Sequence, residues 1–79
     1  NDGVLGGLAD PRLAKALTAM HEQPRRSWSL DDLAEVAGMS RTRFATHFRA
    51  RVGRTPMDYL TRWRMTLARE LLAKGKPVK

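Results

Sequence analysis

The stretch LDDLAEVAGMSRTRFATHFRARV, residues 30–52, decides the fold of this chain. Its first part repeats small and apolar residues at the spacing that places side chains on one face of an α-helix. Gly38 then permits the left-handed backbone of a helix stop. Ser40, two residues later, is a preferred cap for a new helix. Two short helices separated by Gly38-Met39-Ser40 have the dimensions of a helix-turn-helix.

Small residues at the turn indicate how the two helices pack. We expect the helix backbones to cross most closely at Ala34, where a larger side chain would push them apart. Met39 can fill the gap between the helices. The side chains predicted to complete their shared interior are Leu33, Ala37 and Phe44.

The second helix, 41–52, has an apolar stripe and an opposite polar face. Its apolar stripe recurs every fourth residue. With that stripe inward, a period of 3.6 residues turns short polar side chains and arginines outward and leaves Ala45 at the boundary. Thr and Ala can contact thymine methyl groups, and Arg can bind guanine or phosphate. The inward residues are Phe44, Phe48 and Val52, and the outward ones are Thr42, Arg43, Thr46, Arg49 and Ala50.

The charge of the chain favours a polyanionic partner. The net charge is +7, and residues 40–54 hold five arginines and no acidic residue. Such a concentration produces a positive field that attracts polyanions. Charge alone leaves two alternatives open, a solvated basic face and an acidic membrane surface.

The remaining segments predict an all-α fold, a small helical bundle containing a helix-turn-helix followed by a long linker helix. Residues 1–9 are Gly-rich and are interpreted as a flexible linker or cloning remnant. Asp10-Pro11 starts a helix that is expected to run to about His21. Ser29 with Asp32 resembles a capping box for the helix 30–37, and Thr55-Pro56 starts a helix that ends at about Ala73.

Residues 28–78 resemble the DNA-binding region of AraC-type bacterial transcription regulators. The motifs that carry the resemblance are LAEVAGMS, F..HFR...G.TP..YL...R and A..LL. The family has two helix-turn-helix units joined by a long linker helix. The resemblance implies that residues 10–79 form a DNA-binding domain, the N-terminal half of the AraC-type domain, with 41–52 as recognition helix.

The resemblance also implies site residues and partners. The first turn of a recognition helix enters the major groove deepest, and Thr42, Ala45 and Thr46 fall where family members place base-contacting residues. The expected partners are double-stranded DNA, and a second helix-turn-helix unit and N-terminal sensor region of the parent protein, neither of which this sequence contains. The complete set of predicted DNA-binding residues is Arg41, Thr42, Arg43, Ala45, Thr46 and Arg49.

The linker helix is predicted to be apolar over a wider arc than one small partner covers. One stripe, which should pack on the helix-turn-helix, consists of Leu60, Trp63, Leu67 and Leu71. Met65 and Leu72 lie outside this stripe and are predicted to be exposed in an isolated monomer. Arg62 and Arg64, on the same helix, could contact phosphate or the second unit.

Other function classes find less support in the sequence. The chain has no cysteine, and its two histidines and scattered carboxylates suggest no catalytic triad, metal site or cofactor. No apolar run has the length of a membrane span. We therefore expect a cytoplasmic, non-enzymatic protein without a membrane partner. The alternative function is a basic helical protein-interaction module.

Overall fold

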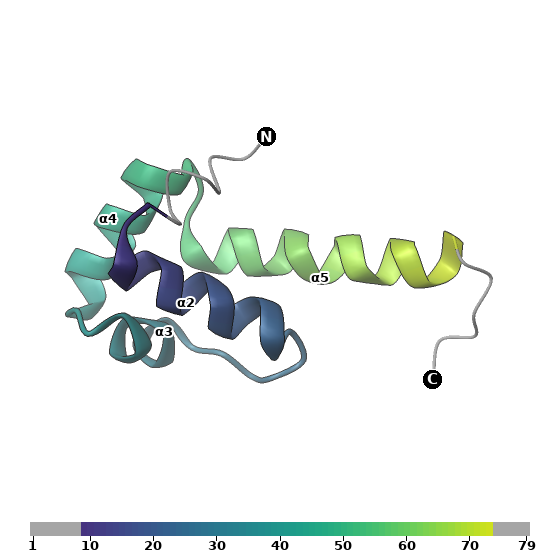
Figure 1. Cartoon of the computed structure of the whole chain (residues 1–79), viewed down its shortest axis with the longest axis horizontal. Helices are drawn as coiled ribbons and strands as arrows, with labels where there is room; N and C mark the ends of the chain where they lie inside the picture. Colours follow the sequence, from purple (N-terminus) through teal and green to yellow (C-terminus); the bar gives the residue numbers. More distant parts are fainter. Residues whose placement is uncertain (1–8, 74–79) are drawn as a thin grey trace.

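The computed structural model describes residues 9–73, which form four helices and contain no strand (Figure 1). The helices are α2 (Pro11–Glu22), α3 (Leu30–Ala37), α4 (Arg41–Val52) and α5 (Pro56–Ala73). The all-α prediction is confirmed, and the first helix ends one residue later than expected. Residues 1–8 of the predicted linker lie outside the described residues.

Local side chains fix the helix boundaries. Oδ1 of Asp10 accepts hydrogen bonds from two backbone N–H groups at the start of α2. At α3, Ser29 and Asp32 form the reciprocal hydrogen bonds of a capping box, as predicted. Gly38 ends α3 with φ 72°, the left-handed conformation that glycine adopts without a Cβ clash. The turn between α3 and α4 is therefore specified by its own residues.

One hydrophobic core joins the helices. α2, α3 and α4 each contribute a buried face, and the first half of α5 closes the core. The Phe48 ring is fully buried in this core, with its centroid 5.6 Å from the Phe44 ring and 5.9 Å from the Tyr59 ring. Ala34 and Ala37 are buried in α3, in agreement with the predicted packing.

The second half of α5 extends beyond the three other helices (Figure 1). Leu60 is fully buried at its beginning, whereas Met65 and Leu72 are 50% and 64% exposed. The prediction that Met65 and Leu72 are exposed is confirmed. The predicted packing stripe is wrong at Leu71, its last residue. Leu71 is also exposed, because α5 extends beyond the other three helices at this point (Figure 1).

The middle of α5 is tied to the connector between α2 and α3. The guanidinium of Arg64 donates hydrogen bonds to the carbonyl oxygens of Pro24, at 2.6 Å, and Arg26, at 2.7 Å. Trp28, which is buried, donates from Nε1 to the carbonyl of Gln23 at 2.8 Å. The connector is thus held by hydrogen bonds from Arg64 of α5 and from Trp28 at its own end.

Within residues 9–73, no helix has both the length and the apolar character that a membrane span requires.

Candidate nucleic-acid interface

α4 carries the predicted site residues on the side that faces away from the core. Phe44, Phe48 and Val52 are buried, which fixes the rotation of the helix about its axis. Ala45 is half-buried at the boundary, as its position in the helical period predicts. The other five predicted DNA-binding residues are exposed: Arg41, Thr42, Arg43, Thr46 and Arg49.

The exposed face of α4 combines two kinds of side chain. Around its centre lie the short side chains of Thr42, Thr46 and Ala50, and a rotation of 100° per residue places Arg43 and Arg49 on opposite flanks. Within residues 9–73, no hydrogen bond or ion pair involves the guanidinium of Arg43 or Arg49. Both cations are therefore free to bind an anion beside the helix.

The first turn of α4 has an unusual charge for a helix start. Partial positive charge at a helix N-terminus favours acidic residues in the first turn, and α3 follows this preference with Asp31 and Asp32. α4 has no acidic residue there and instead carries Arg41 and Arg43. Its N-terminus therefore adds to the field of the arginines, an arrangement that stabilises a bound anion.

One of these arginines has a partner on the preceding helix. Nε of Arg41 lies 3.7 Å from a carboxylate oxygen of Asp31, and both side chains are largely exposed. Exposed pairs of this kind contribute little, because water screens them. The pair therefore leaves Arg41 available for a stronger ligand.

His47 links α4 to the start of α2, a contact that the sequence did not predict. Its Nε2 donates to Oδ2 of Asp10 at 2.6 Å. This hydrogen bond, together with the backbone N–H groups of Arg12 and Leu13, lowers the pKa of Asp10 to about 2. The carboxylate is therefore ionised at neutral pH and ties the two helices together. Asp10 and His47 are 37 residues apart, and neither side chain alone signals the pairing.

Three further polar side chains have partners within the described residues, and the contacts considered for Arg62 and Arg64 with phosphate or a second unit stay predictions. Arg64 holds the α2–α3 connector, as described above. Arg62 donates from Nε to Asp58, one turn earlier on α5, at 3.2 Å. His21 shares a 2.7 Å hydrogen bond with the hydroxyl of Tyr59, and burial lowers the pKa of this histidine. Residues 9–73 bring together no group of His, Asp and Glu side chains suited to a metal ion.

Comparisons of the sequence with known proteins find a helix-turn-helix family and several transcription regulators. A family described as "Helix-turn-helix domain" matches residues 33–79. An AraC-like transcription regulator from Streptomyces lividans is 52% identical over 92% of this chain and 24% of its own length. The corresponding regulator from Streptomyces antibioticus is 48% identical over the same shares. The regulator AlkR from Acinetobacter baylyi is 43% identical over 86% of this chain and 22% of its own length.

The chain spans about a quarter of the length of these relatives. No solved structure matches it. The family match covers the second part of α3, the turn, α4 and α5, which include all the predicted site residues. The chain belongs to the helix-turn-helix family of AraC-type transcription regulators.

Proposed function

We propose that this domain binds double-stranded DNA in a sequence-specific manner and places α4 in the major groove, as part of a bacterial transcription regulator. The observation that carries the proposal is the exposed face of α4, where short side chains are flanked by arginines. A helix of about 10–12 Å diameter fills a groove about 12 Å wide, so the centre of this face meets base edges and its flanks meet phosphates.

The proposal gives the residues of α4 different roles. Thr42 and Thr46, with Ala45 at the edge, are positioned to contact base edges, where their methyl groups fit thymine and the hydroxyl groups pair with either kind of base. Arg43 and Arg49 flank them and bind phosphate or guanine, and Arg41 extends the basic surface at the helix start. Because the relatives are about four times longer than this chain, regulation by a whole protein, with a second helix-turn-helix and a sensor region, belongs to the proposal as well.

Selection from a random pool of DNA duplexes tests the proposal. We expect the domain to enrich a short sequence motif, and Thr46→Arg to change that motif because a new side chain meets the bases. Thr18→Arg is the matched control: it adds the same charge at an exposed threonine of α2. It should leave the motif unchanged.

The other outcomes contradict the proposal. If no motif is enriched and affinity only falls with salt, the basic surface binds polyanions without reading sequence. If Thr18→Arg changes the motif as much as Thr46→Arg, α4 has no special role. Saturable binding of an acidic protein in the absence of DNA binding would support the alternative of a protein-interaction module.

A further inference from the structure

A hollow on the surface lies between the beginning of α2 and the outer face of α4, whose Thr42, Thr46 and Ala50 also line it. Both helices contribute to its wall, and the side chains that could bind a ligand carry a guanidinium, a hydroxyl or an imidazole group. They are Arg12 from α2, Ser40 from the turn, and Thr42, Arg43, Thr46 and His47 from α4.

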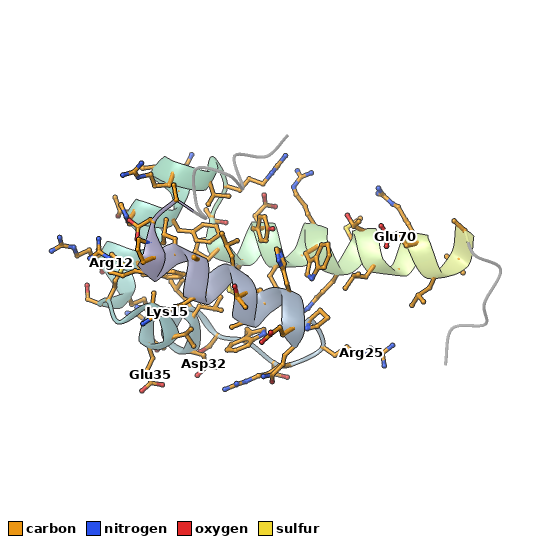
Figure 2. The ribbon with its side chains drawn as sticks, viewed as in Figure 1. Arg12, Lys15, Arg25, Asp32, Glu35 and Glu70 are labelled. Atoms are coloured by element: carbon orange, nitrogen blue, oxygen red, sulfur yellow. The ribbon has the colours of Figure 1, made fainter. Side chains whose placement is uncertain are left out.

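Arg12 is the member of this group that does not belong to the helix-turn-helix. Figure 2 shows it at the start of α2, at the end of the molecule that carries α4. Its side chain is 47% exposed, and its Nε lies 3.7 Å from Oδ1 of Asp10, beyond hydrogen-bond distance. Asp10 already accepts closer bonds from His47, at 2.6 Å, and from the backbone N–H of Arg12, at 2.9 Å. The guanidinium is therefore held loosely and keeps its donors available.

Asp10 is an acidic neighbour of this hollow, because it contacts Arg12 and His47, which line it. Its side chain is only 11% exposed, and both carboxylate oxygens accept hydrogen bonds from the protein. Arg12 of α2 and Arg43 of α4, by contrast, are exposed, and both line the hollow. The field that a ligand meets there is positive.

We propose that this hollow is a binding site for a backbone phosphate of DNA, with Arg12 of α2 and Arg43 of α4 as its ligands. The inference rests on the proposed function and deepens it. With α4 in the major groove, one DNA strand runs along each flank of the helix. Arg49 faces the strand on one flank, and Arg43 with Arg12 faces the strand on the other. The Asp10–His47 hydrogen bond keeps α2 against α4, so the two arginines stay on the same side.

The dependence of DNA affinity on salt tests this site. Each phosphate contact adds about 0.9 to the slope of log affinity against log salt concentration. We expect Arg12→Ala to lower the slope by about 0.9 on a duplex of random sequence. Arg25→Ala is the matched control, because it removes the same charge from the exposed connector, which Figure 2 shows far from α4. Its slope should equal that of the wild type.

A slope that is unchanged in Arg12→Ala would overturn the inference. Equal reductions in both variants would overturn it too, because they would reflect net charge alone. Circular dichroism of each variant establishes that the fold is intact, and Arg12→Lys, which keeps a cation, should restore most of the slope. This test does not depend on sequence preference, so the inference can fail while motif selection by the wild type still supports the proposed function.

Discussion

Replacing Arg64 by alanine should destabilise the domain more than replacing any other exposed arginine of α5. Arg64 donates to two carbonyl oxygens of the α2–α3 connector, which are 38 and 40 residues away in the sequence. Its removal leaves both carbonyls without this donor and frees α5 from the connector. Arg62 is the matched control on the same helix, since its hydrogen bond goes only to Asp58 one turn earlier.

The expected magnitude follows from these contacts. A hydrogen bond from a charged group contributes about 1.5–3 kcal/mol where it is shielded from water. Arg64 is exposed, so we expect the two bonds together to contribute about 2 kcal/mol to the free energy of unfolding. For a domain of this size, about 1 kcal/mol corresponds to about 4–8 °C in Tm, so Arg64→Ala should lower Tm by about 10 °C. Arg62→Ala removes one exposed i,i+4 pair, worth about 0.3–0.5 kcal/mol.

Thermal and urea unfolding of the wild type and the Arg64→Ala, Arg64→Lys and Arg62→Ala variants, followed by circular dichroism, measures the difference. Arg64→Lys should fall between the wild type and Arg64→Ala, because one ammonium group can reach a single carbonyl in place of two. Equal unfolding curves for Arg64→Ala and Arg62→Ala would refute the reasoning, since the long-range bonds would then contribute no more than a surface pair.

Substitutions at four other positions test the fold. Gly38→Ala should lower the free energy of unfolding by about 1 kcal/mol through backbone strain at φ 72°. A steric clash adds nothing to this cost, because an added Cβ has no neighbour within 4 Å. Gly38→Asn should lower the free energy of unfolding less, as measured by urea unfolding, because asparagine tolerates this conformation better. Asp10→Asn should lower the urea midpoint at pH 7. The gap between the midpoints of the wild type and the variant should close as pH falls from about 4 to 2, because the pKa of Asp10 is lowered to about 2 in the folded state and its carboxylate becomes protonated in this range. A gap that persists at pH 2 would contradict this assignment. Phe48→Ala should cost about 3–5 kcal/mol, whereas Leu72→Ala, at a side chain 64% exposed, should leave unfolding almost unchanged.

The sequence predicted what depends on neighbouring residues. The boundaries of α3, α4 and α5 follow from caps and glycines that act within one turn, such as Ser29 and Gly38. The outward face of α4 follows from the spacing of Phe44 and Phe48 along one helix. The residue pattern within one helix was therefore enough to predict which face of α4 carries the candidate site, although the DNA contacts themselves stay predictions.

The contacts that the sequence did not predict connect distant segments. His47 to Asp10 and Arg64 to the connector join residues that only the packing of α2 against the other helices brings together. Periodicity likewise gave no indication of where α5 leaves the bundle, so Leu71 was placed in the packed stripe although it is exposed. The position of Arg12 beside α4 was not predicted either. Arg12 lies on α2, before the segment that carries the family motifs, and only the packing of α2 against α4 brings it there.

The central claim is that the outer face of α4 contacts base edges in the major groove. The most direct test replaces single bases of the selected duplex by analogues altered only in that groove: uracil for thymine removes a methyl group, and 7-deazaguanine removes an acceptor. We expect at least one analogue to weaken binding by the wild type about 5-fold or more, and Thr42→Ala or Thr46→Ala to abolish that sensitivity. Affinity that is indifferent to every analogue, or sensitivity that is identical in the wild type and both variants, would contradict the account.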